Sequence, residues 1–148
     1  VGGGTLQGLS KKLLNEDSSA TLEKLSLAGN RTNLDSLIGE VVNDIGSLHP
    51  EITASNFEKA KYSDDHSNSD IAASLSNMVG EIIGTISYLN ALLMGVSEVF
   101  FIGRVANLEV VRTGITDRLE LASIKGNFDS QSGFGNALGV MFFLNKES

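Results

Sequence analysis

Residues 96–115 read VSEVFFIGRVANLEVVRTGI, and this stretch decides the fold class. The run Val99–Ile102 is apolar at every position, which favours a strand buried on both faces. Gly103 ends the run, and Asn107–Leu119 follows with apolar residues at helical spacing. A strand, a glycine turn and a helix in this order form a ligand-binding corner in open α/β sheets. We therefore predict an α/β fold.

The segments that follow this corner extend the prediction toward the C-terminus. Glu120–Lys125, ELASIK, is predicted as a second and more exposed strand. Ser132–Leu144, SGFGNALGVMFFL, places glycines ahead of an apolar helix that we expect to pack on the sheet.

The segment before the corner, Asp70–Met94, is the clearest helix in the sequence. Its apolar residues recur in steps of three and four over the whole length, which predicts a helix with one buried face. Gly80 and Gly84 lie four residues apart, so another backbone can approach that side closely. Glu81 is the lone charge in the middle, and we expect it to face solvent or a dimer partner. Gly95 is predicted to end the helix.

The first half of the chain contains three further predicted helices and fewer strand signals. They run from Thr5 to Leu14, from a cap at Ser18 or Ser19 to Gly29-Asn30, and from near Thr32 along an apolar stripe to Ile45. Residues 51–57, EITASNF, show no clear period. The whole chain is thus expected to hold about six helices and two or three strands, with a helix-rich α/β arrangement.

The N-terminal residues 1–10, VGGGTLQGLS, are the first candidate for ligand binding. Three glycines, Gly2–Gly4, precede the helix predicted from Thr5. Glycines let a ligand approach the main chain, and the first turn of a helix offers unpaired N–H groups and a positive dipole end. This combination suits a phosphate group, although a flexible linker can have the same composition.

The hydrophilic stretch 58–69 raises the question of a metal site. Asp64, Asp65, His66 and Asp70 could supply carboxylate and imidazole ligands. A solvated loop that leads to a helix N-terminus is the preferred interpretation, because the helix dipole favours an acid such as Asp70 in its first turn. We therefore predict no metal ligands in this chain.

Composition narrows the classes of function. The 148 residues have a formal net charge of −7, which argues against a nucleic-acid partner. Cysteine is absent and only two histidines occur, so thiolate chemistry is excluded and a zinc enzyme is disfavoured. The longest charge-free stretch, Ile82–Ser97, is shorter than the roughly 20 residues that a membrane span needs. We expect a soluble cytoplasmic protein with no membrane partner.

Six segments in one order resemble the type II pantothenate kinases, especially the bacterial form. They are GGGTLQGL, AGNRTNLD, EITASNF, MVGEII, VFFIG and SGFGNALG, and the resemblance covers essentially the whole chain. It implies a fold of the actin-like, sugar-kinase and heat-shock ATPase superfamily, whose two ribonuclease-H-like halves enclose a nucleotide. By this resemblance, residues 1–148 form a single C-terminal ATPase-type domain, which is helix-rich and contains a small mixed sheet. The N-terminal half, with a glycine-rich first phosphate loop, the general base and much of the pantothenate pocket, is expected to lie outside the chain.

The resemblance also implies site residues and a reaction. Gly3, Gly4, Thr5, Leu6 and Gln7 match the family stretch that lies against ATP, and Gly103 matches a glycine on the adenosine side. The implied reaction transfers the ATP γ-phosphoryl group to pantothenate, with Mg²⁺ bound through ATP, as the first step of coenzyme A synthesis. No catalytic residue is expected in this chain, and the isolated fragment should be inactive. A homodimer is implied, and the helix with Gly80 and Gly84 is either part of its interface or only packs under the sheet.

Three positions depart from the family pattern, and two other functions stay open. Arg104 stands where a small polar residue is common in the family, and its side chain can stack on a base or contact a phosphate. Asn136 and Glu58 stand at two positions where glycine is common. One alternative function is a sugar or small-alcohol kinase of the same superfamily. The other is a non-catalytic nucleotide-binding module.

Overall fold

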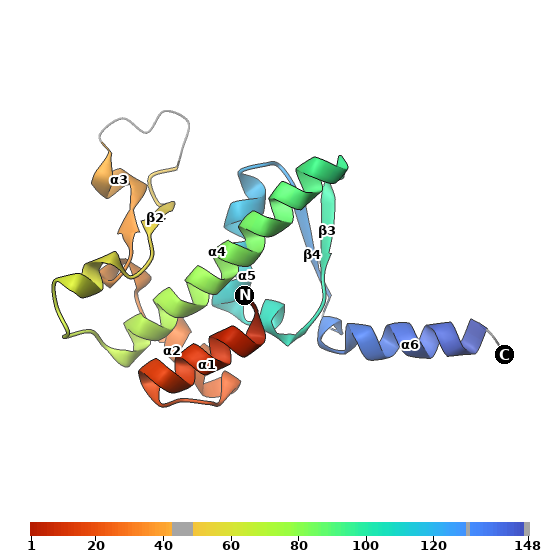
Figure 1. Cartoon of the computed structure of the whole chain (residues 1–148), viewed down its shortest axis with the longest axis horizontal. Helices are drawn as coiled ribbons and strands as arrows, with labels where there is room; N and C mark the ends of the chain where they lie inside the picture. The colour runs from red at the N-terminus through yellow and green to blue at the C-terminus, as the bar shows by residue number, and fades with distance from the viewer. Residues whose placement is uncertain (43–48, 130, 147–148) are drawn as a thin grey trace. The chain divides into compact units, whose positions relative to one another are not determined.

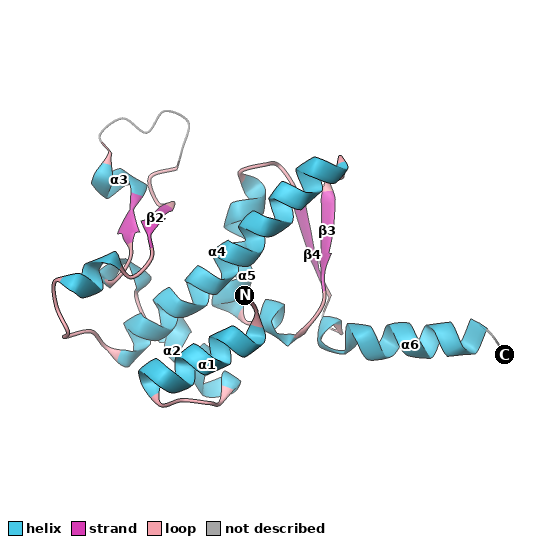
Figure 2. Cartoon of the chain, in the orientation of Figure 1, coloured by secondary structure: helices cyan, strands magenta, loops and turns pink. Residues whose placement is uncertain are grey.

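A computed structural model describes residues 1–42, 49–129 and 131–146, with the side chains of residues 145 and 146 left out. These residues contain six α-helices, as the sequence predicted (Figures 1 and 2). They also contain four short strands, which form two two-stranded sheets in place of the one mixed sheet that was expected. The chain divides into two compact units, one of residues Val1–Gly4 with Val79–Ser148 and the other of residues Thr5–Met78. The α/β class is therefore confirmed in its helix-rich form.

The second unit, Thr5–Met78, is mostly helical. Its elements are most of α1 (Gly3–Leu14), α2 (Ser19–Ala28), η1 (Arg31–Asn33), β1 (Ser36–Leu37), α3 (Ile38–Val41), β2 (Thr53–Ser55), η2 (Glu58–Lys61) and the start of α4 (Asn68–Met94). Ser18 caps α2 by accepting the N–H of Thr21 at 3.3 Å, as predicted. Buried apolar side chains from α1, α2 and α4 and from the end of η1 form its core, and they include Leu6, Leu22, Leu75 and Leu34.

The prediction of a helix that begins near Thr32 is wrong for the residues that the structure describes. Residues Ser36–Leu37 instead pair in antiparallel fashion with Thr53–Ser55, and only Ile38–Val41 is helical. Asp35 explains the difference, because its side chain is fully buried and accepts the N–H of Phe57 at 2.9 Å. This contact draws the following residues toward the 53–57 segment and away from a continuing helix. Ile45 of the predicted stripe lies outside the described residues.

Gly29 ends α2 for a reason other than a left-handed turn. Its φ is −92°, so a side chain is not excluded by backbone conformation. A Cβ added at Gly29 would lie 1.9 Å from the carbonyl oxygen of Ser69, however. Glycine is required here because the end of α2 contacts the backbone at the start of α4.

Asp70 joins the start of α4 to the loop after α2. Its carboxylate accepts the N–H of Asn30 at 2.7 Å and the side-chain amide of Asn33 at 3.1 Å. These hydrogen bonds, that of Asn30 first, hold the pKa of Asp70 below its ordinary value, and nearby His66 lowers it further. Among the described residues no group of three or more His, Asp or Glu side chains is placed to hold a metal ion.

We expect Asp70 to stabilise the fold above the pKa that it has in the unfolded chain, about 3.9. Because the folded-state pKa is lowered, this contribution is lost as pH falls through the folded value. Asp70→Asn should lower the free energy of unfolding by up to about 1 kcal/mol at pH 6 and by less at pH 3, where the carboxyl of the unfolded chain is mostly protonated. Urea unfolding of both proteins at each pH measures this difference. A gap that stays constant or widens toward pH 3 would contradict the assignment.

The first unit is built from α4, α5 (Glu109–Glu120) and the parallel strands β3 (Glu98–Phe101) and β4 (Lys125–Phe128). It also holds η3 (Arg104–Asn107), η4 (Ser132–Phe134) and α6 (Gly135–Lys146). Helix α4 confirms the long helix of the sequence, and Gly95, with φ +65°, ends it. The N–H groups of Gly95 and Val96 donate to the carbonyls of Leu92 and Ala91, which is the Schellman arrangement.

The two glycines of α4 pack against α5 of the same chain. A Cβ on Gly80 would lie 2.4 Å from the carbonyl oxygen of Val111, and one on Gly84 would lie 2.7 Å from that of Ile115. The close backbone approach predicted from their spacing is confirmed. Because α5 occupies this side of α4, the glycines are not available to a second chain.

Glu81 lies between these glycines and is buried, which corrects the prediction that it faces solvent or a dimer partner. Its Oε1 accepts from Arg118 Nη2 of α5 at 3.0 Å. The close helix contact at Gly80 and Gly84 brings the two side chains together, and a buried carboxylate requires such a partner.

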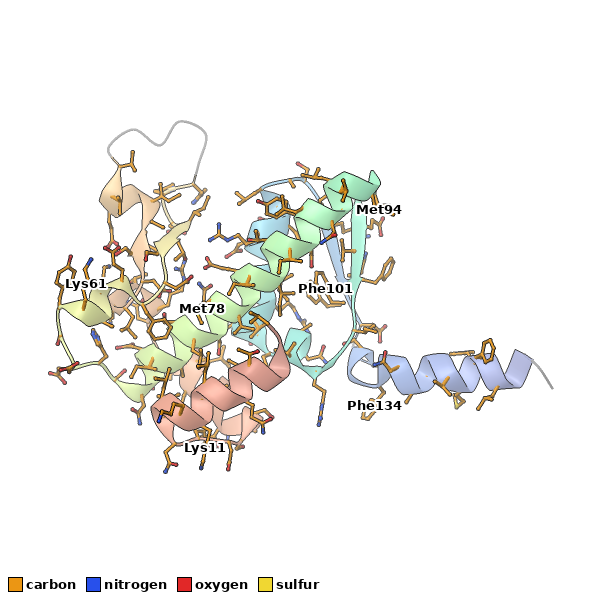
Figure 3. All side chains as sticks on the ribbon, in the orientation of Figure 1. Lys11, Lys61, Met78, Met94, Phe101 and Phe134 are labelled. Carbon is orange, nitrogen blue, oxygen red and sulfur yellow. The ribbon has the colours of Figure 1, made fainter. Side chains whose placement is uncertain are left out.

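The β3–β4 sheet is covered on one face only. Phe101 stacks on Phe128 at 4.8 Å between ring centroids, and Arg112 of α5 lies over the Phe128 ring, so this face meets α5. Phe100, on the other face, is 74% exposed. The prediction of burial on both faces is therefore wrong for the described chain. Figure 3 labels Phe101 on the inner side of the strand.

The C-terminal predictions also need correction. Residues 120–124 are the end of α5 and a turn, and the strand begins at Lys125. Helix α6 forms as predicted, but it extends away from β3 and β4 (Figure 1), and its residues Val140, Met141, Phe142, Phe143 and Leu144 are all exposed. No helix within the described ranges has the length and apolarity needed to cross a bilayer.

Candidate functional site

The glycine-rich N-terminus forms the first turn of α1. The helix begins at Gly3, two residues earlier than predicted. The N–H groups of Gly3, Gly4 and Thr5 therefore lie in a first turn, where an α-helix provides no acceptor of its own. Cβ atoms added at Gly2 or Gly4 would meet nothing within 4 Å. This end of the helix consequently has room for a ligand, and the helix dipole favours a negatively charged one.

A second glycine turn lies at the end of β3. Gly103 has φ +103° and ψ 156°, a conformation that other residues rarely adopt. It leads directly into η3, where Val105 Cβ lies 3.5 Å from the position of a Cβ on Gly3. The structure thus places Gly3 beside the first turn after Gly103, although the two glycines are about 100 residues apart in the sequence.

The loop before α6 is fixed to this turn by two hydrogen bonds. The N–H of Gly103 donates to the carbonyl of Ser132 at 2.8 Å, and Ser132 Oγ donates to Asn107 Oδ1 at 2.8 Å. Ser132 is buried, so these bonds hold the loop in place. Sequence reasoning missed both Asn107 and Ser132, since single polar residues in loops give no signal of their partners.

Arg104 extends from this turn into solvent. Its side chain is exposed, and its Cγ lies 3.3 Å from the position of a Cβ on Gly133. The absence of a side chain at Gly133 leaves space for the aliphatic part of Arg104. Arg104 therefore provides a positively charged side chain directly after Gly103.

The remaining predicted site residues belong to the second unit. Thr5 is exposed, Leu6 is buried in the core, and Gln7 Nε2 donates to the carbonyl of Asp17 at 3.2 Å. The side chains of Leu6 and Gln7 are therefore engaged in packing and in a hydrogen bond within the second unit. Only main-chain groups of these two residues are suited to ligand contact.

Two of the three departures from the family pattern lie on other elements than the glycine turns. Glu58 begins η2 and pairs with Lys61 at 2.7 Å, and this contact holds the pKa of Glu58 below its ordinary value. Asn136 is the second residue of α6 and is exposed. Arg104 is the departure that lies at the site.

Comparison with known proteins agrees with the resemblance described above. The type II pantothenate kinase of Bacillus cereus (strain G9842) is 32% identical over 149 residues, which cover 99% of this chain and 55% of that protein. The protein of the same name from Bacillus anthracis is 38% identical over 105 residues, covering 70% of this chain and 38% of the relative. Pantothenate kinase 1 of Arabidopsis thaliana is 35% identical over 161 residues, covering 100% of this chain and 42% of the relative.

This chain therefore spans about half the length, or less, of these curated relatives. Its match to the Fumble family extends over residues 1–141, nearly the whole chain. The chain belongs to the Fumble family.

Proposed function

We propose that this chain is the C-terminal half of a pantothenate kinase and supplies one side of its ATP site. The carrying observation is that Gly3, at the start of α1, lies beside Val105, two residues after Gly103, in a chain whose relatives are named pantothenate kinases. The reaction would transfer the γ-phosphoryl group of ATP to the primary hydroxyl of pantothenate. This is the first step of coenzyme A synthesis.

In this proposal, the main chain at the start of α1 binds phosphate. The N–H groups of Gly3, Gly4 and Thr5 would donate to phosphate oxygens, and the helix dipole would favour the negative charge. Phosphoryl transfer depends chiefly on positioning and on charge stabilisation, so such contacts are a direct contribution to catalysis. Mg²⁺ bound through ATP would bridge the phosphates.

The Gly103 turn would lie on the adenosine side. Its conformation favours glycine, which leaves the main chain after β3 without a side chain at this position. The exposed Arg104 would stack on the base or pair with a phosphate. The general base and the pantothenate pocket would come from the half of the protein that precedes Val1. The two halves would each have a ribonuclease-H-like fold, and the whole protein would act as a cytoplasmic homodimer.

The direct test supplies the whole protein with ATP, Mg²⁺ and pantothenate and measures formation of phosphopantothenate. We expect product from the whole protein and none from the 148-residue chain alone. Turnover of a sugar or another alcohol, with none of pantothenate, would refute the substrate. ATP binding without any phosphoryl transfer would indicate a non-catalytic module.

We predict that Gly4→Asp in the whole protein weakens ATP use without weakening the fold. The new carboxylate would lie in the first helical turn, where it suits the dipole but repels phosphate. We expect kcat/KM for ATP to fall about 10- to 100-fold, with an unchanged thermal midpoint. Gly8→Asp is the matched control, since it adds the same charge one turn further along α1 and also meets open space. Equal kinetics for the two variants would contradict phosphate binding at Gly4.

A further inference from the structure

Arg112, near the start of α5, connects this helix both to the sheet and to the η3 turn. The Cζ atom of its guanidinium lies 5.2 Å from the centroid of the Phe128 ring, and its Nε donates to the carbonyl of Ala106 at 3.4 Å. Its main-chain N–H donates to the carbonyl of Leu108 at 2.8 Å. A single residue therefore contacts the end of β4, the η3 turn and the junction between η3 and α5.

The Phe128 ring, over which the guanidinium lies, is itself held in place. Phe101 stacks on it, with 4.8 Å between the ring centroids and 9° between the ring planes. Its Cε2 lies 2.9 Å from the position of a Cβ on Gly126. Phe101 and Phe128 are the last residues of two parallel strands, and open α/β sheets bind ligands at this end of their strands. Arg112 is thus attached to the edge of the sheet where a ligand is expected.

The η3 turn carries groups that the proposed ATP site requires. It begins directly after Gly103 and its first residue is Arg104. Its second residue, Val105, has its Cβ 3.5 Å from the position of a Cβ on Gly3, in the first turn of α1. A displacement of η3 would therefore move the Gly103 turn relative to the N–H groups at the start of α1.

Two side chains tie the second half of η3 to the rest of its unit. Ser132 Oγ donates to Asn107 Oδ1 at 2.8 Å, which fixes the turn to the loop before α6. Arg112 Nε donates to the carbonyl of Ala106, a buried residue, which fixes the turn to β4 through the Phe128 ring. The Arg112 contact consequently sets where η3 lies relative to the ends of the strands.

The two arginines of α5 have different surroundings. Arg118 pairs with buried Glu81 at 3.0 Å and joins α5 to α4. Arg112 is exposed, and an exposed contact between a cation and an aromatic ring contributes little to stability. A role for Arg112 in placing the turn accounts for its contacts better than a role in holding the helices together.

From these contacts we propose that Arg112 is a positioning residue for the nucleotide. It holds the η3 turn against the ends of β3 and β4, and so sets the spacing between the Gly103 turn and the N–H groups at the start of α1. It acts through Ala106 and Val105 and not by contact with the nucleotide. This inference rests on the proposal that these two elements bind ATP. Its effect should be appreciable, because a misplacement of about 1 Å can cost a site about 100-fold.

The test uses the product of the complete reading frame and compares the wild type with Arg112→Met. Methionine keeps an unbranched side chain over the ring but removes the charge and the Nε donor. We expect the KM for ATP to rise about 5- to 20-fold, while kcat and the KM for pantothenate each change less than about threefold. The thermal midpoint should fall by less than about 3 °C. Arg112→Lys keeps the charge without the planar donor group, so its KM for ATP should lie between the two.

Lys125→Met is the matched control for the loss of a positive charge. Lys125 is the first residue of β4, lies at the opposite end of the strand from Phe128, and pairs with Glu98 at 3.8 Å. The substitution lowers the net charge by the same amount without removing a contact to η3. We expect it to change the KM for ATP by less than about twofold, since an exposed charge at this distance is screened.

A double-variant cycle tests whether Arg112 acts through the Phe128 ring. Phe128→Leu removes the ring and should also weaken ATP binding. Because both substitutions break the same connection, the double variant should lose less ATP affinity than the product of the two single losses. Losses that multiply would show that Arg112 does not act through this ring.

The outcomes separate this proposal from the proposed function. An unchanged KM for ATP in Arg112→Met, or an equal rise in Lys125→Met, would overturn the role of Arg112. So would a fall in kcat as large as the rise in both KM values together with a midpoint lowered by more than about 5 °C, which would indicate a role in the fold alone. Calorimetric titration with Mg-ATP gives the Kd of each variant without turnover. A wild type that binds ATP but does not phosphorylate pantothenate would refute the kinase function, and the Kd values would then decide the role of Arg112. A wild type that binds no ATP would refute both.

Discussion

Gly80→Ala should lower the free energy of unfolding by about 2–3 kcal/mol, and Gly80→Val should lower it further. The added Cβ would lie 2.4 Å from the carbonyl oxygen of Val111 and 3.1 Å from its Cα. These are backbone atoms of α5, so no side-chain rotation can relieve the contact. The helices must separate, which weakens the packing of Val111 and Ile115, both fully buried.

The control for this prediction is Gly8→Ala, in the middle of α1. A Cβ at Gly8 meets nothing within 4 Å, so only the helix propensity of alanine acts. This change should raise the stability by up to about 1 kcal/mol. Urea unfolding of the three proteins measures the contrast. The prediction fails if Gly80→Ala and Gly8→Ala change stability in the same direction.

Asp35→Ala should destabilise the fold by about 3–5 kcal/mol. The Asp35 side chain is fully buried and accepts the Phe57 N–H at 2.9 Å and the hydroxyl of Ser74. Arg31 Nη1 lies 3.7 Å from its other oxygen. Alanine would leave the buried N–H and hydroxyl without this acceptor, and such groups are costly away from water.

Phe57 adds to this effect through its backbone. Its φ is +57°, a conformation that costs a residue with a side chain about 1 kcal/mol or more. The hydrogen bond from its N–H to Asp35 helps to hold that conformation. Loss of Asp35 should therefore also loosen the 53–57 segment.

Two milder variants separate the contributions at this cluster. Asp35→Asn keeps an acceptor oxygen and should cost less than alanine, while Ser74→Ala removes one donor and should cost about 1 kcal/mol. Urea unfolding midpoints provide the measurement. A loss below about 1 kcal/mol for Asp35→Ala would show that the buried cluster does not hold the 31–37 and 53–57 segments together.

The sequence by itself determined the long helix, its glycine contact and the family. The apolar steps of three and four over Asp70–Met94 predict α4 because burial of one face repeats with the helical period. The four-residue spacing of Gly80 and Gly84 predicts a close backbone approach on one side, and Gly95 the helix end. The order of the glycine motifs indicated the relatives, and the comparisons bear this out.

Tertiary structure decided what local pattern leaves open. The stripe after Thr32 has a helical period, but buried Asp35 requires the N–H of Phe57, so a strand pair forms at Ser36–Leu37. Glu81 appears in sequence as an exposed charge, and only the close packing of α5 supplies Arg118 as its buried partner. The contact of Gly3 with Val105, two residues after Gly103, likewise depends on segments about 100 residues apart. Sequence periodicity records which side of an element is apolar; which distant group that side meets is set by packing of the whole chain.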